Sequence, residues 1–336
     1  MNRRYANSRK KGILIFVVLF LLLAAAVIGV HFAEKRLSVP IPHAGEQVTA
    51  HTSFINTAQV FMNDRWYAQR NVETLLVMGI DESGILEKND SYNNSQQTDF
   101  LVLFARDLDT GGTFAVPLNR DTMTDITTLG VTGQQTGTRY AQLALAYNYG
   151  SGDHISSRNV TAAVEHLLYG VNVDHYITVT MDAVPIINDW AGGVVLEVLD
   201  DFADVDDTLV QGELVRLDGQ QALTYVRARM GLDDGSNVHR MERQRQYAIE
   251  WVKSARNSLS NTQAVAELAL QLNGYYRSSC NVEQLQDYAQ SLSINPSLPI
   301  YEIPGAAVQG ETYMEFYADE NALQQLVLEL FYVPVE

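Results

Sequence analysis

The chain has 336 residues and a formal net charge of -17 at pH 7, from 40 acidic residues against 23 lysines and arginines. So acidic a surface repels the phosphates of nucleic acids and anionic lipid headgroups, which argues against a nucleic-acid-binding role. Cys280 is the only cysteine. The chain therefore has no internal disulfide and must rely on its apolar core for stability.

The N-terminal segment predicts a membrane anchor. Basic residues and no acidic ones lie in the first 12 positions, and Ile13–Val30 follows as 18 residues without a charge. Such a run can span a bilayer, and its basic flank is expected to stay in the cytoplasm. The alternative is a cleaved signal peptide, but the run is long for one and residues 30–33 form a poor cleavage site. We expect a cytoplasmic tail at 1–12, one transmembrane helix at 13–31, a linker and lead-in at 32–70, and an extracytoplasmic domain at 71–336.

Short apolar runs predict β-strands in this domain. The expected strands are Thr74–Gly79, Phe100–Ala105, Thr113–Leu118, Tyr176–Met181, Gly193–Val198 and Pro299–Ile303. The first run is apolar throughout, which is typical of a strand buried on both faces. Glu82–Gln97 is polar and contains glycine and several asparagines, so we expect a loop there. Gly305–Tyr317 is interpreted either as a loop over the site or, as we favour, as inert surface.

Stretches with helical spacing of apolar residues alternate with these strands. The expected helices are Ala141–Tyr149, Ser156–Tyr169, Ala183–Trp190, Asp218–Val226, Asn237–Ser258, Thr262–Leu272, Val282–Ser291 and Asp319–Phe331. Ser156 or Ser157 is expected to cap one helix and Asp218 another, because their oxygens accept hydrogen bonds from free helical N–H groups. The alternation predicts an α/β fold, a three-layer α-β-α sandwich with a mixed central sheet, preceded by one transmembrane helix.

Charged side chains gather at the ends of the predicted strands. Asp81 follows the first strand, and Arg120 and Asp121 follow the third. Asp99 opens the second strand from the neighbouring loop. Ligands of open α/β sheets bind beyond the strand ends. Two carboxylates holding a hard divalent cation, beside arginines, make a phosphoryl or pyrophosphoryl site, although each acidic residue has a structural alternative as a turn or helix cap.

Arginines are concentrated in Leu217–Gln246 of this otherwise acidic chain. They are Arg227, Arg229, Arg240, Arg243 and Arg245. Guanidinium groups are planar and permanently charged, and they bind phosphate oxygens two at a time. The alternative is a solvated helix face on which Glu242 and Glu250 neutralise part of the charge.

The usual nucleotide and hydrolase signatures are missing from the sequence. It contains no glycine-rich phosphate loop with a lysine, no Gly-x-Gly-x-x-Gly opening a helix and no Gly-x-Ser-x-Gly turn. An NTPase, a dinucleotide-dependent dehydrogenase and a serine hydrolase therefore have little support. The histidines at 154, 166, 175 and 239 lack metal-ligand spacing, so we interpret each as a surface or structural residue.

Taken in order, these motifs make the chain resemble the LytR-CpsA-Psr family of membrane-anchored cell-envelope transferases. The resemblance covers about residues 73–252 and includes the position and orientation of the anchor. The motifs that carry it are Leu75–Asp81, Thr98–Leu101, Pro117–Thr122, Leu217–Arg229 and Arg240–Gln244. An exported domain without disulfides also suits a bacterial cell membrane, of the Gram-positive type, better than a eukaryotic secretory route.

The resemblance implies a metal-dependent phosphotransferase of the polyisoprenyl-teichoic acid–peptidoglycan transferase type. It would move a glycopolymer phosphate (teichoic acid, capsule or similar) from a polyprenyl-pyrophosphate carrier to a cell-wall acceptor such as a peptidoglycan hydroxyl. Asp81 and Asp99 are implied to bind Mg²⁺ or Mn²⁺. The substrate-binding residues implied are Arg120, Asp121, Arg227, Arg229, Arg240, Arg243 and Gln244, with Asp121 orienting an arginine. Those assigned to catalysis are Asp99, Arg120, Arg227 and Arg229.

The family's fold also implies an apolar groove for the prenyl chain between sheet and helices. Residues that could line it are Leu143, Leu145, Val164, Leu167, Leu168, Ile186 and Ile187. The alternative for each of them is an ordinary place in the core.

Departures from the family pattern leave a second function open. Gln97, Ser83 and Thr124 stand where the family usually has arginines, although Arg139 or Arg158 could replace one of them. Each charge-assisted contact is worth about 1.5–3 kcal/mol, so their loss points to weaker pyrophosphate binding or a different substrate. The alternative is a non-catalytic, membrane-anchored envelope protein that binds lipid-linked glycan or scaffolds wall enzymes.

Overall fold

A five-stranded sheet forms the centre of the fold in the computed structural model, which describes residues 59–89, 91–92, 95–228, 237–295 and 298–335. The strand order is β11-β8-β3-β4-β5. These strands are β3 (Val72–Ile80), β4 (Thr98–Asp107), β5 (Thr113–Pro117), β8 (His175–Val179) and β11 (Tyr276–Ser278). β3 and β8 run parallel, whereas the other neighbours are antiparallel. The predicted mixed central sheet is confirmed.

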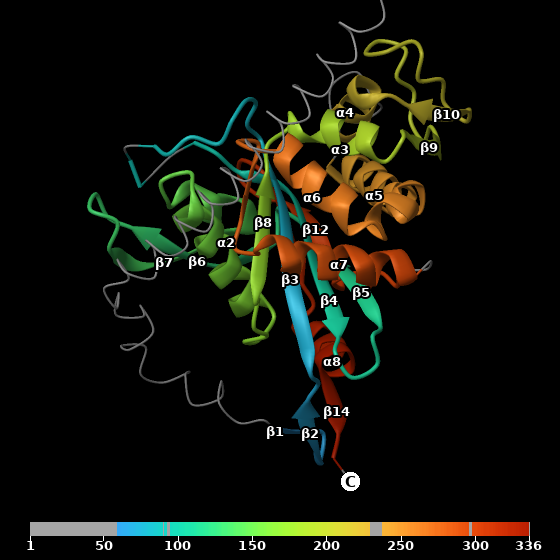
Figure 1. The fold of residues 1–336 in the computed structure, drawn as a ribbon. Helices are drawn as coiled ribbons and strands as arrows, with labels where there is room; N and C mark the ends of the chain where they lie inside the picture. Colours follow the sequence, from blue (N-terminus) through green and yellow to red (C-terminus); the bar gives the residue numbers. More distant parts are fainter. Residues whose placement is uncertain (1–58, 90, 93–94, 229–236, 296–297, 336) are drawn as a thin grey trace, which may run out of the picture. The chain divides into compact units, whose positions relative to one another are not determined.

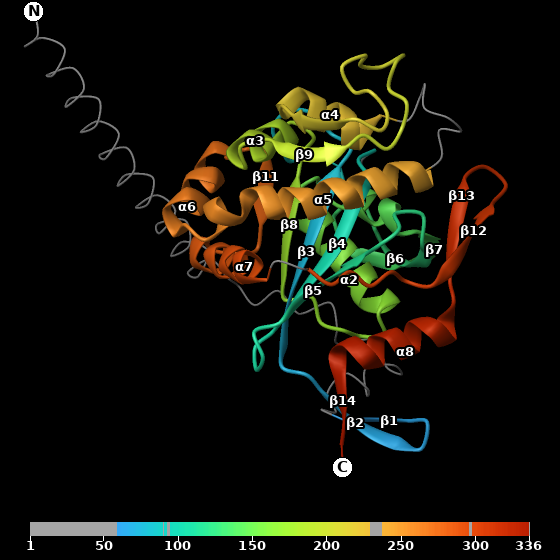
Figure 2. The same ribbon diagram turned by 90° about the vertical axis from the view of Figure 1, so that its right-hand side faces the viewer.

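Helices cover both faces of this sheet (Figure 1). One face carries η1 (Leu143–Asn148, a 3-10 helix), α2 (His154–Leu167) and α8 (Glu320–Phe331). The other carries α3 (Ala183–Trp190), α5 (Asn237–Leu259), α6 (Thr262–Gln271) and α7 (Val282–Ile294). Figure 2 shows α5 crossing the strands on this second side. The α/β class and the helical layers on both sides of the sheet therefore agree with the pattern read from the sequence.

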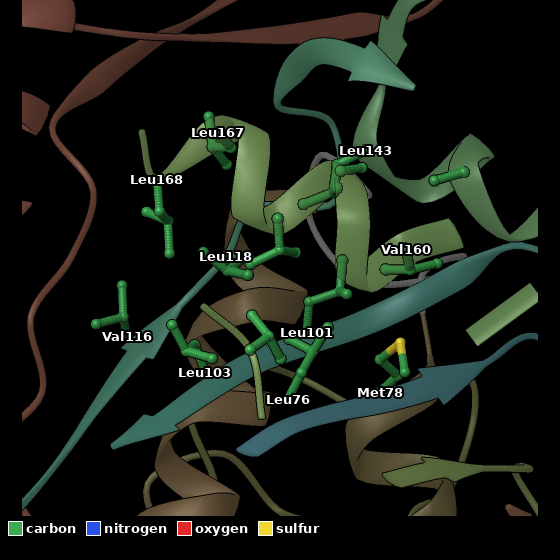
Figure 3. Close-up of a cluster of buried hydrophobic side chains, with 14 of the residues drawn as sticks. Leu76, Met78, Leu101, Leu103, Val116, Leu118, Leu143, Val160, Leu167 and Leu168 are labelled. Carbon is green, nitrogen blue, oxygen red and sulfur yellow. The ribbon is translucent and has the colours of Figure 1, made fainter. Parts of the chain in front are cut away.

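Successive residues of β3 and β4 point to opposite faces of the sheet. Leu76, Leu101 and Leu103 point toward α2 and are almost completely buried. They pack with η1 and α2 side chains in a continuous core, shown in Figure 3. The intervening residues, including Val77 and Val102, face the α5 side. Burial on both faces is the reason why these strands are apolar throughout rather than alternating.

Helix caps agree with the sequence in one case and correct it in another. α4 (Gly219–Arg227) begins with a capping box, in which Asp218 accepts from the Gln221 N–H at 2.9 Å and the Gln221 side chain accepts from the Asp218 N–H at 3.0 Å. The expected caps Ser156 and Ser157 instead lie inside α2, which Asp153 caps by accepting from the Ile155 N–H. Both serines are buried, and the Ser157 hydroxyl bonds that of Thr178 on β8 at 2.8 Å.

Hairpins account for most of the elements that the sequence did not predict. The unpredicted hairpin strands are β6 (Met123–Leu129) with β7 (Gln135–Gln142), β12 (Gly305–Gln309) with β13 (Met314–Ala318), and β10 (Leu214–Leu217). The partner of β10 is β9 (Val194–Glu197), which lies within the expected strand Gly193–Val198. β12 and β13 occupy the stretch that we interpreted as inert surface. The expected strand Pro299–Ile303 is reduced to an isolated bridge between Ile300 and Ala115.

A small sheet joins the two ends of the described chain. Its strands are β1 (Gln59–Met62), β2 (Arg65–Gln69) and β14 (Tyr332–Pro334), with β2 in the middle. β1 and β2 precede residue 71, where we placed the start of the domain, and they belong to the same compact unit as the rest. The predicted tail, the transmembrane helix and the linker as far as residue 58 lie outside the described residues. Among the residues that are described, no helix combines the length and apolar character needed to cross a membrane.

Candidate active site

A bulge at the end of the central sheet places Asp99. β3 and β4 pair regularly as far as Gly79 and Phe100, but Ile80 then pairs with Thr98, so Asp99 is an extra residue on β4. A bulge turns a side chain out of the regular alternation of a strand. Asp99 and its neighbour Phe100 accordingly line the same cavity, which regular alternation would not allow.

The Asp99 carboxylate binds two arginines from distant parts of the chain. Arg120, which follows β5, forms an ion pair with one oxygen, and Nη1 of Arg240 on α5 lies 2.9 Å from the other. Arg240 is only 2% exposed, so its charge depends on this partner for compensation. Both arginines also line the cavity. Asp99 therefore fixes in place two permanently charged groups that can meet an anion there.

Arg120 is fixed from two further sides. Its Nη2 donates to Oε1 of Gln97 at 2.6 Å, and its Nε lies 3.4 Å from Oδ1 of Asp121. The Gln142 amide donates to the same Asp121 oxygen at 3.2 Å. Gln97, which we counted as a lost cation, thus contributes a hydrogen-bond acceptor that positions Arg120.

Asp81 lies at the same edge of the sheet as Asp99. Its backbone N–H donates to the Gln97 carbonyl at 3.0 Å, which ties the end of β3 to the start of β4. The Asp81 side chain is exposed. The two aspartates that the sequence singled out thus flank one strand end, although they are separated by the whole Glu82–Gln97 loop.

Arg227 and Gln244 also belong to the polar part of the cavity lining. Arg227 is the last residue of α4 and is exposed. Gln244 of α5 donates through Nε2 to the Val226 carbonyl at 3.1 Å and so joins α5 to the end of α4. Arg229, to which we assigned both binding and catalysis, lies outside the described residues.

Arg243 has a different environment from the one we expected. It lies outside the cavity lining, and its Nε is 3.2 Å from Oδ2 of the buried Asp200. Its guanidinium covers the Phe202 ring at 5.2 Å and donates to the Ala228 carbonyl. Burial lowers the pKa of Arg243, and the Asp200 charge opposes that shift. Neighbouring helix positions diverge by about 100°; Gln244 consequently faces the cavity while Arg243 holds the end of α4.

The cavity has a volume of about 440 Å³ and lies between the sheet and α3, α5, α6 and α7. Its walls are apolar, with side chains such as Val77, Val102, Ile177 and Leu268. The charged and amide side chains of its lining are Asp99, Arg120, Arg227, Arg240, Gln244 and Arg245. β3 ends, β4 begins and β5 ends at this side. The cavity is thus an apolar chamber with one polar mouth.

The apolar residues that we expected to line a groove are mostly elsewhere. Leu143, Val164, Leu167 and Leu168 belong to the filled core on the α2 side, shown in part in Figure 3. Leu145 packs against the same core. Ile187 lines the cavity, whereas its neighbour Ile186 does not. The reason is topological, because η1 and α2 cover the face of the sheet opposite to the cavity.

The described residues include no group of three or more His, Cys, Asp or Glu side chains that could hold a metal ion. Magnesium, however, is commonly bound by one or two carboxylates together with substrate phosphate oxygens. Asp81 and Asp99 at one strand end match that incomplete set. Asp99 lines the cavity and Asp81 lies outside its lining, and both Asp99 oxygens bind arginines.

The two other departures from the expected arginine pattern have structural explanations. Thr124 is 4% exposed on β6 and points inward, so the position is closed to a long cation. Ser83 is exposed in the loop after β3. The candidate replacements Arg139 and Arg158 are exposed and lie outside the cavity lining. Arg245 does line the mouth, where its Nη1 lies 2.7 Å from Oε1 of Glu302; only its place in the arginine-rich run could have pointed to it.

Comparisons with known proteins show the family and the fold of the chain. A profile of the LytR_cpsA_psr family matches residues 43–331. The chain belongs to the LytR_cpsA_psr family. One curated LytR_cpsA_psr relative is the polyisoprenyl-teichoic acid–peptidoglycan teichoic acid transferase TagU of Halalkalibacterium halodurans. It is 32% identical over 168 residues, which are 44% of this chain and 54% of that protein, so the match spans about half of the relative's length.

Solved structures show that the fold is shared. TagV of B. subtilis superposes with a TM-score of 0.59 at 21% identity, covering 77% of this chain and 97% of that one. TagT bound to LIIa-WTA gives a TM-score of 0.58 at 18% identity, covering 77% and 89%.

Proposed function

We propose that this protein transfers a glycopolymer, with its phosphate, from a polyprenyl-pyrophosphate carrier to a cell-wall hydroxyl such as one on peptidoglycan. The proposal is carried by the apolar cavity of about 440 Å³, in whose lining the charged side chains among the described residues are Asp99 and the arginines at the mouth. A long apolar chain with a pyrophosphate head has this same division of polarity. The name of the relative TagU and the complex of TagT with LIIa-WTA support this class of substrate.

Binding would use the two parts of the cavity separately. Burial of the prenyl chain gains about 0.8 kcal/mol for each CH₂ group removed from water. Arg120, Arg227 and Arg240 at the mouth would bind the pyrophosphate oxygens, each contact being worth about 1.5–3 kcal/mol. The tail therefore supplies affinity, and the arginines fix the reacting phosphorus.

The transfer is a substitution at the phosphorus that carries the glycan. The acceptor hydroxyl oxygen forms a bond to this phosphorus, and the bond from it to the bridging oxygen of the pyrophosphate breaks. Prenyl phosphate leaves while Arg120 and Arg240 stabilise its growing charge. The hydroxyl proton moves to a carboxylate, for which Asp99 is our candidate. The products are a phosphodiester on the acceptor and prenyl phosphate with its chain in the cavity.

Asp81 and Asp99 would hold Mg²⁺ or Mn²⁺ against the pyrophosphate. When bound, the cation would neutralise part of the phosphate charge and polarise the bond to phosphorus. We expect Asp81→Asn to lower the response of pyrophosphate binding to added Mg²⁺, because Asp81 is exposed and its loss leaves the Asp99 ion pairs intact. An unchanged Mg²⁺ response in this variant would contradict the metal assignment.

The proposed place of action is the outer face of a bacterial membrane, with the run at 13–31 as anchor and residues 1–12 in the cytoplasm. Its support is the N-terminal charge pattern alone. Protease added to intact protoplasts should digest the domain and spare an N-terminal epitope tag. Protection of the domain would reverse the proposed topology.

The first experiment measures binding of a long-chain polyprenyl pyrophosphate to the full chain, with and without Mg²⁺. Arg227→Ala should weaken binding by roughly ten- to a hundredfold, which corresponds to the loss of one charge-assisted contact. Arg139→Ala is the matched control, because Arg139 is also exposed but lies outside the cavity lining. Equal affinity in the two variants would remove the arginines at the mouth from the proposal.

Turnover is tested next with a lipid-linked glycan and peptidoglycan as acceptor. We expect release of prenyl phosphate that depends on Asp99 and Arg240. Tight, Arg227-dependent binding without release of prenyl phosphate would instead support the non-catalytic envelope protein that the sequence left open.

A further inference from the structure

A polar pair follows the inner end of the cavity, and the strand register shows where the change occurs. On the α5 side, the paired residues from the mouth inward are Gly79 with Phe100, Val77 with Val102, and Leu75 with Phe104. The next pair on the same face is Glu73 with Arg106. At about 3.3 Å per residue, the apolar strip from Gly79 to Leu75 is about 13 Å long.

Glu73 and Arg106 form an ion pair that connects several elements at this end. Arg106 Nη2 lies 2.5 Å from Glu73 Oε2, with both side chains about one-fifth exposed. His175 of β8 lies 3.5 Å from the other Glu73 oxygen, and Gln284 of α7 bonds His175 at 2.9 Å. Arg106 also donates to Ser291 of α7 at 3.2 Å. The pair thus ties β3, β4, β8 and α7 together just beyond the cavity.

Tyr288 of α7 lies between this ion pair and the cavity. Its ring lines the cavity, is 4% exposed and lies 5.3 Å from the Arg106 guanidinium. Its hydroxyl donates to the Thr74 carbonyl at 3.1 Å, and its ring meets the edge of His175 at 6.2 Å. Burial raises the pKa of Tyr288, so the hydroxyl remains a donor at physiological pH. These contacts hold the ring across the inner end of the strip.

An apolar chain that entered further would have to displace Tyr288 and then meet the Glu73–Arg106 pair. Each of these partly exposed charges would lose hydrogen bonds and solvent without gaining a polar partner. In the apolar strip, by contrast, every additional CH₂ group that leaves water strengthens binding about fourfold. The gain from a longer chain therefore stops where Tyr288 begins.

We propose that Tyr288, held by the Glu73–Arg106 pair, forms a floor that sets how much of a prenyl chain this cavity buries. The inference rests on the proposed function and adds a determinant of carrier recognition to it.

The test compares prenyl pyrophosphates of increasing length, from farnesyl and geranylgeranyl to undecaprenyl, on the full chain. Trp251 lines the cavity and stacks on Trp190 at 6.1 Å, so its fluorescence reports binding. With the wild type, affinity should rise with chain length and then reach a limit. In Tyr288→Ala the limit should move to longer chains, whereas Tyr288→Phe, which keeps the ring, should retain the wild-type limit.

A second variant keeps the test decisive if removal of the ring destabilises the protein. Replacing Glu73 and Arg106 together by leucine extends the apolar strip without leaving an unpaired charge. This double variant should also bind longer chains more tightly than the wild type does. The floor alone would be overturned if affinity in either variant stopped rising at the same chain length as in the wild type. This conclusion requires that binding still depends on Arg227 and that the thermal transition is unchanged. Absence of binding by the wild type would overturn the proposed function and the floor together.

Discussion

The two faces of the central sheet come from the same strands and are equally apolar, yet one is filled and the other is hollow. On the α2 side, large side chains such as Leu143 and Tyr147 reach the strands and leave no gap. On the other side, each of α5, α6 and α7 contributes an alanine to the cavity lining, namely Ala248, Ala269 and Ala289. Similar apolar strands can therefore border a filled core on one face and a cavity on the other.

Truncation of two neighbouring leucines on β3 should give the largest difference in unfolding free energy between the two faces of the sheet. Leu76→Ala removes a side chain with no exposed area from the filled core and should cost about 2–5 kcal/mol of unfolding free energy. Leu75→Ala should cost roughly half as much, because Leu75 borders a cavity and has fewer packed neighbours to lose. Urea unfolding of both variants measures the difference. Equal losses would mean that the cavity side is closed in solution.

Larger side chains on β4 also distinguish the two faces, because a packed core has no room for added atoms and a cavity does. Leu103→Phe overfills the packed face and should destabilise the protein by about 1–3 kcal/mol. Val102→Phe points into the cavity and should leave the thermal transition nearly unchanged while it weakens binding of farnesyl pyrophosphate. Retention of wild-type binding by Val102→Phe would show that the prenyl chain lies somewhere else.

The smallest expected effect on stability comes from the carboxyl group of Glu165 on the filled side of the sheet. Burial raises the pKa of Glu165 on α2, which accepts a hydrogen bond from the Val173 N–H at 3.0 Å. Because the raised pKa belongs to the folded state, ionisation costs stability as the pH rises above the ordinary value of about 4.3. Glu165→Gln avoids that cost and keeps the acceptor, so it should melt at a higher temperature than the wild type at pH 7. The difference in melting temperature between the two proteins should disappear near pH 4. A difference that does not change with pH would contradict this explanation.

Local chemistry made part of the structure predictable. Ala183–Trp190 forms α3 with the bounds that its apolar spacing indicated, and Asp218 caps α4 as its side chain and its position before a helix required. The apolar run from Thr74 gave β3 because burial on both faces selects such a sequence. Each of these elements depends on residues that are close together in the chain.

What the sequence did not show depends on distant contacts. Asp99 meets Arg240 across 141 positions, after a bulge that leaves no mark in the residue pattern. Arg240 and Arg243 share one motif, but the fold sends the first to the cavity and the second to Asp200. Whether an apolar face is filled depends on how closely the covering helices approach, and periodicity carries no information about that distance. β7 was missed because most of it is exposed and polar.

The pairing of β14 with β2 has a consequence for biosynthesis. Tyr332 pairs with Gln69, so the sheet begun by β1 and β2 cannot be completed until synthesis has reached β14, more than 260 residues later. Contacts of such long sequence separation form slowly, and the chain remains open to proteases while they are missing. A product that stopped before residue 332 would leave one edge of β2 unpaired. Pairing with β14 thus satisfies the backbone groups along this edge of β2 and shields the edge from pairing with other chains.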